Sequence, residues 1–452
     1  MPDRDKDSAR VVRAARKALG DAMRGLAAYH ANACVKCGLC GESCHIYRAE
    51  PEPENLPAAK ADEVIRFYRR YHTLAGRLVP GLVGARDLTP EALDRLVEAV
   101  YGRCTACGRC GLHCSIGLDV ASVIGAGRRM LVAAGRVPDG LQRTVDNQLE
   151  TGNQMSIPRE ELIATAEWLS EDLQQETGRK DAVIPVDQPG RRMLYLINPR
   201  EVKFFPLSLS AAAGVFAAAG ESWTISSKFY DVTNYGLFSG DDAAAGELTR
   251  RVIEEAQALG VREIILGECG HGFRSFRWEG PNWMQREYPL PMRSLLELLE
   301  EYLGTAPQPG ADGPPGSAAA APPARIRVDP SKNAERVTLH DPCNLVRWGG
   351  VMEPQRRVLR RCCAEFVEMT PNRHDNFCCG GGGGMLSMSE YGERRVASGR
   401  LKAEQIRATE AKFVATPCHN CADQLLEINK HYKLGVEIKA VVELVYNALV
   451  WD

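Results

Sequence analysis

The sequence predicts an α+β protein in which a helix-rich domain is followed by two α/β lobes that are pseudo-repeats of each other. Three observations lead to this fold class. Helical periodicity dominates the chain up to about residue 180, and short apolar strands alternate with helices after residue 190. The motifs at the strand ends of the last third then repeat those of the middle third at similar spacing. We therefore expect domains at 1–180, 190–303 and 325–452, with a flexible linker at 304–324.

Composition places the chain among globular proteins. Its 452 residues are 44% hydrophobic and 25% charged, which is enough material for two or three packed domains. Lys and Arg total 56 against 58 acidic residues, so the net charge of −2 gives no electrostatic basis for a nucleic-acid partner. The start is charged and no apolar stretch has the length of a membrane span. We expect a cytoplasmic protein that reaches the inner face of a membrane, if at all, through a partner subunit.

The first periodic segment runs from about Ser8 to His30 and carries apolar residues at helical spacing, with Arg and Lys on the other face. A basic amphipathic helix of this kind can lie on a membrane surface. The more common arrangement is packing on its own domain, and we expect that arrangement here.

Two four-cysteine motifs follow, and both have the spacing C-x2-C-x2-C-x3-C. They comprise Cys34, Cys37, Cys40 and Cys44, and Cys104, Cys107, Cys110 and Cys114. This spacing resembles that of bacterial two-cluster ferredoxins, in which the fourth cysteine, at the start of a helix, ligates the other cluster. The resemblance implies one [4Fe-4S] cubane on Cys34, Cys37, Cys40 and Cys114, and a second on Cys104, Cys107, Cys110 and Cys44. Zinc is the alternative, but zinc sites rarely need the third spacing.

The motifs also depart from the ferredoxin pattern. His45 and Ser115 stand where a proline usually follows the fourth cysteine, and 59 residues separate the two motifs. The insert has helical periodicity at 61–71 and 90–100. A helix-rich, ferredoxin-like module with two clusters is similar to the small electron-delivering subunit of heterodisulfide reductase, here fused ahead of a second part.

The rest of the chain reads as an internal duplication. Strands are expected at 193–197, 264–266, 337–339 and 413–415, with candidate ligands on the loops after the strand ends. Three pairs of segments align: 197–200 with 340–343, 233–236 with 377–380, and 267–272 with 416–421. The 33 and 33 residues between the ligand positions of the first copy match 34 and 38 in the second.

The second copy carries five cysteines in the pattern C-x34-CC-x38-C-x2-C, and five glycines follow the adjacent pair. These cysteines are Cys343, Cys378, Cys379, Cys418 and Cys421. Glycine lets the backbone pass close to a bulky group. Five thiols exceed the four ligands of one zinc ion, whereas a multi-iron cluster can use all five. A zinc site or a disulfide pair is the plainer alternative.

This arrangement resembles the CCG domain of heterodisulfide reductase catalytic subunits, in which five cysteines hold a non-cubane iron-sulfur cluster at the site of disulfide chemistry. The first copy retains only Cys269, because Arg200, Asn234, Tyr235 and Gly272 stand at the other ligand positions. A single intact CCG copy is similar to the catalytic subunits of sulfate reducers' membrane redox complexes.

The resemblance implies an iron-sulfur oxidoreductase that passes electrons through two cubanes to the non-cubane cluster on Cys378, Cys379 and their partners. There it would reduce or form a disulfide-like bond in a small molecule or small protein. Cys269 is expected to be an extra ligand, a thiol that receives the departing substrate sulfur, or a buried remnant. His271 would supply a proton to that sulfur. We expect partners among redox subunits, either a membrane cytochrome or quinone module or a flavoprotein.

Two other functions fit the same motifs. The chain could be a non-catalytic relay subunit between a membrane quinone or cytochrome module and a soluble acceptor. It could also be the iron-sulfur subunit of a glycolate or lactate dehydrogenase, although those relatives are expected to keep both CCG copies. The Gly380–Gly384 run lacks the residues of a phosphate loop. Cys362 and Cys363 lie in a predicted helix at 355–367 and are expected in the core.

Overall fold

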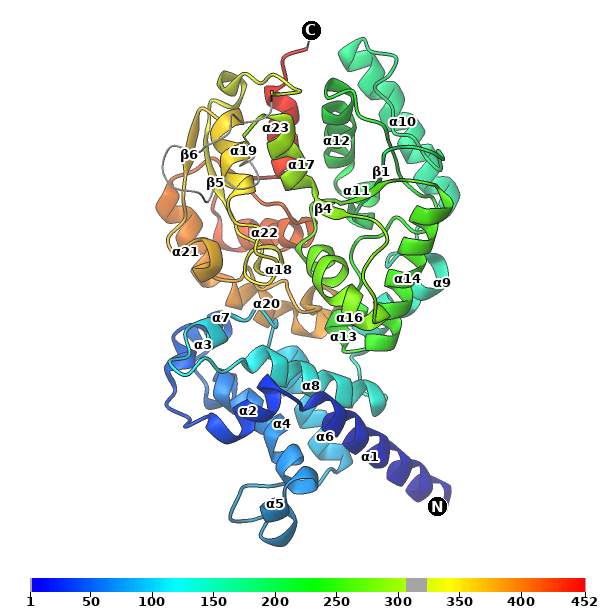
Figure 1. Cartoon of the computed structure of the whole chain (residues 1–452). Coiled ribbons are helices and arrows are strands. Elements are labelled where there is room, and N and C mark those ends of the chain that lie inside the picture. The colour runs from blue at the N-terminus through cyan, green and yellow to red at the C-terminus, as the bar shows by residue number, and fades with distance from the viewer. Residues whose placement is uncertain (1, 306–322, 452) are drawn as a thin grey trace, which may run out of the picture. The chain divides into compact units, whose positions relative to one another are not determined.

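The computed structural model describes residues 2–305 and 323–451 (Figure 1). Apart from its ends, the predicted linker at 304–324 lies outside the described residues. The chain forms two compact units, each assembled from three segments. Unit 1 comprises Met1–Val145, Tyr235–Ala245 and Asp375–Glu404, and unit 2 comprises Asp146–Asn234, Gly246–His374 and Gln405–Asp452. Each predicted domain is a continuous segment of the chain, and the boundaries of these domains stay a prediction.

Unit 1 is helical. Its helices are α1 (Pro2–Ala22), α2 (Leu26–Ala33), α3 (His45–Ala49), α4 (Pro57–His72), α5 (Leu74–Leu78), α6 (Pro90–Val97), α7 (Arg109–Leu112), α8 (Val120–Ala133), α13 (Gly236–Ser239) and α20 (Gly392–Ser398). A π-helical turn, η3 (Glu98–Gly102), continues α6. The helical periods predicted at 61–71 and 90–100 therefore correspond to α4 and to α6 with η3.

The first helical segment packs on its own unit. Helix α1 lies against α8 and α4, and Ala15 and Leu19 are fully buried there. This confirms the prediction that the segment packs rather than stays free for a membrane. The expected continuous helix from Ser8 to His30 is wrong, because the chain breaks between α1 and α2. Gly25 caps α2 with φ 52°, a left-handed conformation that glycine adopts at little cost.

Unit 2 contains two four-stranded sheets, and every neighbouring pair of strands is parallel. The first sheet has the order β2-β1-β3-β4 and the second β6-β5-β7-β8. The strands are β1 (Met193–Leu196), β2 (Trp223–Thr224), β3 (Glu263–Leu266), β4 (Met292–Ser294), β5 (Arg336–Leu339), β6 (Glu365–Val367), β7 (Phe413–Ala415) and β8 (Glu437–Lys439). The four predicted strands are the central strands of these sheets, and the four edge strands were not predicted.

Helices connect the parallel strands within each sheet, and further helices precede the first sheet, join the two sheets and follow the second. They are α10 (Arg159–Thr177), α11 (Pro199–Lys203), α12 (Pro206–Ala218), α15 (Gly270–Gly272), α16 (Gly280–Met284), α17 (Leu295–Tyr302), α18 (Cys343–Val346), α19 (Pro354–Cys362), α22 (His419–Tyr432) and α23 (Val441–Ala448). Three more helices cross the unit boundary along the chain: α9 (Asp139–Thr151), α14 (Asp242–Ala258) and α21 (Arg400–Thr409). The expected α+β class is confirmed.

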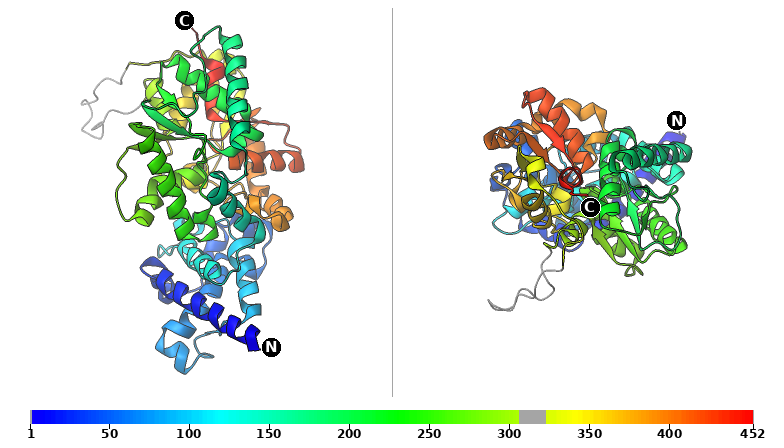
Figure 2. Two further views of the ribbon diagram at one scale, coloured as in Figure 1. Left: turned by 90° about the vertical axis from the view of Figure 1, so that its right-hand side faces the viewer. Right: turned by 90° about the horizontal axis from the view of Figure 1, so that it is seen from above.

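The two lobes of unit 2 repeat each other in topology as well as in sequence. Their strand orders correspond one to one, with β1 and β3 in the places of β5 and β7. Helix α12 of the first lobe packs against α23 of the second, and α17 of the first packs against α19 of the second. Helix α12 corresponds to α19, and α17 corresponds to α23. A pseudo-twofold rotation that exchanges the two lobes therefore also exchanges these two contacts. Figure 2 shows the green lobe and the yellow-to-red lobe side by side.

One predicted helix is divided in the structure. The segment 355–367 was expected to be helical throughout, but α19 ends at Cys362 and β6 begins at Glu365. The side-chain amide of Asn333 donates a hydrogen bond to the Cys362 carbonyl at 2.8 Å and so satisfies a carbonyl at the helix end. Pairing with β5 then outweighs the helical period of the sequence, with Val337 opposite Phe366.

Among the described helices, none combines the length and the apolar character needed to cross a lipid bilayer.

Candidate metal centres

The thiols predicted for the first cubane lie together in unit 1. One hollow is lined by Cys34, Cys37, Cys40 and Cys114. These are three cysteines of the first motif and the last of the second. Cys110 also reaches the wall of this hollow. The arrangement is the one that the ferredoxin-like exchange of fourth ligands implies.

A second hollow holds the complementary set. Its lining includes Cys44, Cys104, Cys107 and Cys110. Since Cys110 lines both hollows, the two thiol sets are direct neighbours. Neighbouring cluster sites are what a one-electron relay needs.

The two motif loops share one backbone conformation. Lys36 and Gly38 have φ values of 56° and 84°, and Ala106 and Gly108 have 50° and 79° at the corresponding positions. Each glycine carbonyl then accepts a hydrogen bond from the amide three residues later, at 2.9 Å in the first loop and 3.1 Å in the second. Two non-glycine residues thus adopt left-handed angles that cost energy, which is typical of a loop shaped around a site.

The fourth cysteines differ from each other. Cys44 is the N-cap residue of α3, as predicted. Cys114 lies in a turn, and its carbonyl accepts the Gly117 amide at 2.9 Å. The next helix, α8, begins only at Val120, after its N-cap Asp119. The prediction that each fourth cysteine begins a helix is therefore wrong for Cys114, because the turn at Gly117, with φ 67°, delays the helix.

The donor atoms fit iron-sulfur clusters. All sixteen cysteines lie in the described part of the chain, and there each is a free thiol. Each hollow is lined by the four thiols predicted for one cluster, with Cys110 lining both, and thiolate is the ligand that iron-sulfur clusters use. In the second hollow the Lys60 ammonium also lies 3.7 Å from the Cys44 sulfur, so a positive charge faces the thiol set.

The loops of the second lobe lie at the carboxyl ends of its two central strands. Cys343 begins α18 after β5, and Cys418 is the N-cap of α22 after β7. Cys421 follows in the first turn of α22. Strand order reverses between β5 and β7, and crevices at such switch points are where open parallel sheets bind ligands.

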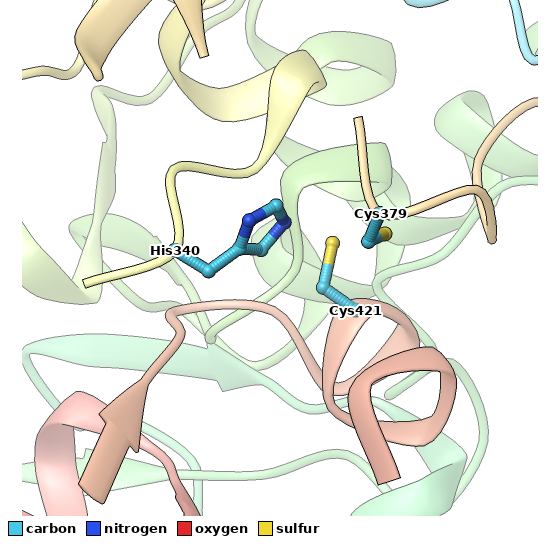
Figure 3. A group of neighbouring side chains, drawn as sticks. All are labelled: His340, Cys379 and Cys421. Carbon is cyan, nitrogen blue, oxygen red and sulfur yellow. The ribbon is translucent and has the colours of Figure 1, made fainter. Parts of the chain in front are cut away.

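His340 is a polar residue of this loop pair that the sequence did not single out. A ring nitrogen of His340 and the Cys421 sulfur lie within 4.8 Å of each other, and Figure 3 shows both side chains pointing into the same space. His340 is fully buried, and neither ring nitrogen has a hydrogen-bond partner among the described residues. The sequence signal that could have identified His340 is its position directly after β5, three residues before Cys343.

A buried ion pair fixes the Cys343 loop. Asp341 and Arg356 are both inaccessible to solvent and form two hydrogen bonds of 2.7 and 2.9 Å. The Asp341 carboxylate also accepts the Arg373 amide at 2.6 Å. Paired charges with saturated hydrogen bonds are costly to move, so this loop is held rigidly.

The Cys378–Cys379 loop belongs to unit 1, where it is built onto the second ferredoxin-like motif. A Cβ atom placed on Gly383 would stand 2.5 Å from the Thr105 carbonyl oxygen. Arg128 donates to the Gly383 carbonyl and to the Cys104 carbonyl, each at 2.8 Å. The structure therefore joins Cys378 and Cys379 to the second hollow, and their convergence with Cys343, Cys418 and Cys421 stays a prediction.

Arg109 makes a further link within unit 1. Its guanidinium stacks 3.9 Å from the centre of the Phe377 ring and donates to the Asp375 carbonyl at 2.7 Å. It also donates to the Ser43 carbonyl at 3.0 Å. Arg109 thus joins the chain beside Cys44 to the segment that precedes Cys378.

In unit 2 the surviving loop of the first lobe faces the Cys418 loop. The Cys269 and Cys418 thiols lie close enough to shift each other's pKa, and the His271 ring is hydrogen-bonded to the Asn420 side chain. The His419 amide donates to the Glu268 carbonyl at 3.1 Å. Cys269 and Cys418 are each the N-cap of the helix that follows, as the duplication predicts.

The lost ligand positions have acquired other contacts. Arg200, at the position equivalent to Cys343, forms an ion pair with Asp423 of the second lobe. A Cβ atom on Gly272 would lie 2.0 Å from the Val232 carbonyl oxygen, so no side chain fits where the equivalent of Cys421 would stand. The contacts at these positions thus favour packing of the first lobe against the second.

Burial controls the ionisation of the groups around these loops. It raises the pKa of Glu268 well above its usual range, although the carboxylate caps α23 by accepting the Val441 and Val442 amides. Burial also raises the pKa of Glu201 to about 8 and lowers the pKa of His419 to about 4. Burial therefore favours the uncharged form of each of these groups next to the thiols.

Cys362 and Cys363 lie in the hydrophobic core of unit 2, and their sulfurs are 3.7 Å apart. This is the core position expected from the sequence. Neither residue contributes to the loops described above.

Two family models match the chain. One, described as a 4Fe-4S dicluster domain, matches residues 30–118, and the other, the CCG cysteine-rich domain, matches residues 337–426. The chain therefore carries a domain for two [4Fe-4S] clusters and a cysteine-rich domain that indicates a further iron-sulfur cluster.

Among curated proteins, the chain is 29% identical to the Hdr-like menaquinol oxidoreductase iron-sulfur subunit 2 of Archaeoglobus fulgidus, covering 92% of this chain and 79% of the relative. It is 26% identical to one of the subunits of the dihydromethanophenazine:CoB–CoM heterodisulfide reductase of Methanosarcina barkeri, covering 92% and 94%. It is also 21% identical to the EtfAB:quinone oxidoreductase of Syntrophomonas wolfei, covering 88% and 55%. The resemblance to heterodisulfide reductase-like proteins is thereby confirmed.

Proposed function

We propose that this heterodisulfide reductase-like iron-sulfur oxidoreductase carries electrons through its two [4Fe-4S] sites to a five-thiol, non-cubane site that reduces or forms a disulfide-like bond. The observation that carries the proposal is the attachment of the Cys378–Cys379 loop to the second ferredoxin-like motif within unit 1. A pair of cysteines with a purely structural role would not need such a connection. A terminal site that receives electrons from the second hollow does need it.

The two four-thiol hollows supply the path. When bound, the cubanes supply one-electron transfer at potentials that the protein environment sets. Cys110 borders both hollows, and Arg128 joins the Cys104 loop to the Gly383 loop. Cys34, Cys37, Cys40 and Cys114 would hold the entry site, which lies nearer to solvent because Cys37 is exposed.

The terminal site would combine two contributions of the chain. Cys378 and Cys379 come from the glycine-rich loop, and Cys343, Cys418 and Cys421 come from the switch point of the second sheet. Glycine at 383 and 384, with φ values of 65° and 89°, lets the loop curl without side chains. The curled backbone of the glycine run is the reason that we assign all five cysteines to one cluster rather than to separate thiols.

The substrate step needs two electrons and two protons, because reduction of R–S–S–R′ gives RSH and R′SH. The electrons would come from a partner redox subunit, one at a time. On this chain, His271 would deliver a proton and Cys269 would receive a sulfur, a proposal supported by the position of their loop opposite the Cys418 loop. Catalytic roles for Cys378, Cys379, Cys269 and His271 are part of this proposal.

The names of the relatives support a partner in the membrane. Two of them are described as acting with menaquinol and with dihydromethanophenazine, which are lipid-soluble electron carriers. We propose that this chain likewise receives or delivers electrons through a membrane cytochrome or quinone module, or through a flavoprotein. It would then reside at the cytoplasmic face through that partner.

A second function has support from another relative. The match to an EtfAB:quinone oxidoreductase favours a relay in which the chain only passes electrons between a flavoprotein and a quinone module. In that case no disulfide would be a substrate. A dehydrogenase iron-sulfur subunit would be a special case of this relay.

The two functions are separated by a disulfide assay. The anaerobically reconstituted protein is reduced with a viologen dye and mixed with low-molecular-weight disulfides or heterodisulfides. We expect dye oxidation with release of two thiols per two electrons, lost in Cys379→Ser and kept in Cys362→Ala, whose thiol lies in the core. Dye oxidation by a quinone analogue alone, with no thiol release from any disulfide, would favour the relay.

A further inference from the structure

Unit 1 buries two cations beside the second hollow. Lys60 and Arg128 are each only 2% exposed. The Lys60 ammonium donates to the Arg103 carbonyl at 2.6 Å and lies 3.7 Å from the Cys44 sulfur. The Arg128 guanidinium donates to the Cys104 carbonyl at 2.8 Å. Both cations thus touch residues of the second thiol set or their backbone.

Neither cation has a carboxylate partner. In the part of the chain that the structure describes, Lys60 and Arg128 form no ion pair, and their hydrogen bonds go to backbone carbonyls and to the Cys44 thiol. Burying an unpaired charge costs several kcal/mol, so buried cations are nearly always matched by anions. The cysteines of the second hollow are placed to match these two cations, once they are thiolates that hold a cluster.

The first hollow has a different environment. Its lining includes Lys36, but this side chain is 56% exposed and its ammonium is paired with the Asp62 carboxylate at 3.0 Å. Cys37 of this hollow is itself exposed. Arg103, which lines the second hollow, is likewise offset by Glu98 at 3.1 Å. Water is thus available to the first site, whereas Lys60 and Arg128 provide unpaired positive charge at the second.

We propose that Lys60 and Arg128 raise the reduction potential of the second cluster, so that it can accept an electron from the more exposed first cluster. The inference rests on the proposed assignment of cubanes to the two hollows. Reduction adds one negative charge and no proton, and a fixed positive charge beside the site favours the added electron. The ammonium of Lys60 and the guanidinium of Arg128 supply that positive charge at the second site. Both side chains act through their positive charge and do not ligate iron.

The path of the electron agrees with this role. An electron would pass from the first site to the second, where Arg128 also donates to the Gly383 carbonyl at 2.8 Å. The same guanidinium would therefore favour reduction of the second site, and it fixes the loop that carries Cys378 and Cys379. Electrons would collect at the site to which the terminal thiols are attached.

The test is an EPR-monitored redox titration of the full-length, anaerobically reconstituted protein. The two cubane signals are first assigned with Cys37→Ser and Cys107→Ser, which should each alter one signal. Lys60→Met should then lower the midpoint potential of the second cluster and leave that of the first unchanged. Lys60→Arg should keep the wild-type value, since it keeps the charge. Lys36→Met is the matched control and should move neither potential, because its charge is exposed and paired.

Arg128 provides an independent pair of variants. Arg128→Gln should lower the same potential, and Arg128→Lys should largely retain it. Lys60→Met and Arg128→Gln remove the charge, whereas Lys60→Arg and Arg128→Lys keep it. Loss of iron from the second site in the first two variants, with full iron in the other two, would also support the requirement for positive charge. The inference is overturned if Lys60→Met with full iron keeps the wild-type potential, or if Lys60→Arg shifts it equally. If Cys37→Ser and Cys107→Ser alter the same signal, the assignment of the clusters fails instead.

Discussion

Gly383 and Thr105 are in backbone contact, close enough that a Cβ atom on Gly383 would stand 2.5 Å from the Thr105 carbonyl oxygen. Thr105 follows the first cysteine of the second ferredoxin-like motif, and Gly383 belongs to the run that follows Cys379. Two motifs that are 278 residues apart in number (383 minus 105) therefore fold as one structure within unit 1. The contact explains why the glycine run is needed, since any side chain at Gly383 would push the two backbones apart.

The first prediction concerns this contact. Gly383→Ala should lower the midpoint of urea unfolding and reduce iron retention, because the methyl group meets backbone that cannot rotate away. The left-handed φ of 65° adds to the cost. We expect a loss of stability of about 2–4 kcal/mol from the overlap and the backbone strain together.

Gly135→Ala is the matched control for that variant. Gly135 has nearly the same φ, 64°, but nothing lies within 4 Å of its Cβ position. It should therefore show only the backbone cost of about 1 kcal/mol and normal iron content. Equal effects of the two substitutions would contradict the importance of the close approach.

The exchange of fourth ligands gives a second prediction. Cys114→Ser should damage the cluster on Cys34, Cys37 and Cys40, because Cys114 lines the first hollow and not the second. Cys44→Ser should damage the other cluster for the converse reason. EPR spectra of the two reduced variants check this. Loss of the cluster adjacent in sequence to each changed cysteine would show that the ligands are not exchanged.

The central strands and the ligand loops were largely predictable from the sequence. The strands at 193–197, 264–266, 337–339 and 413–415 are short apolar runs, and the ligand motifs directly follow them. The edge strands were missed for a physical reason. Trp223–Thr224 has only two residues and Glu437–Lys439 has a charged residue at each end, so neither is the apolar run seen in the central strands, and pairing with a central strand makes them extended.

Long-range placement was harder to predict. Nothing in the pattern around Cys378 says that its loop folds with unit 1, because that choice depends on contacts with Thr105 and Arg128. The burial of lone polar residues was also hidden in the sequence. Lys60 and Arg128 occur in ordinary amphipathic helices, and His340 lies in a strand-end motif beside a cysteine. Burial distinguishes all three, and among the described residues the two cations have no ion-pair partner and the His340 ring has no hydrogen-bond partner. Burial is a tertiary property.

A third prediction addresses the surviving thiol of the first lobe. Cys269→Ser should leave iron content within one cluster of the wild type and sharply reduce disulfide turnover, because the Cys269 loop faces the Cys418 loop at the substrate side of the proposed site. Cys362→Ala, a change in the core, should lower stability by about 1 kcal/mol and keep turnover. Unchanged turnover in Cys269→Ser, with His271→Ala equally silent, would remove both residues from the mechanism.

The fourth prediction concerns the ion pair under the Cys343 loop. Asp341→Ala leaves Arg356 buried and unpaired on that side, so the protein should lose about 3–5 kcal/mol of stability in urea unfolding. Iron should also be lost from the terminal site, because the loop before Cys343 is released. Arg336→Ala removes the exposed pair with Glu365 and is the control, with an expected change of at most about 1 kcal/mol. Comparable losses in the two variants would contradict a special role for the buried pair.

The central claim is that thirteen cysteines hold three clusters, the last of them a five-thiol non-cubane cluster that reacts with sulfur substrates. Anaerobic iron analysis combined with EPR of the reduced and the thiol-treated protein tests this most directly. We predict about twelve irons per chain and, after thiol treatment, a paramagnetic signal that is absent from Cys379→Ser. About eight irons with cubane signals alone, or zinc in place of iron, would contradict the account.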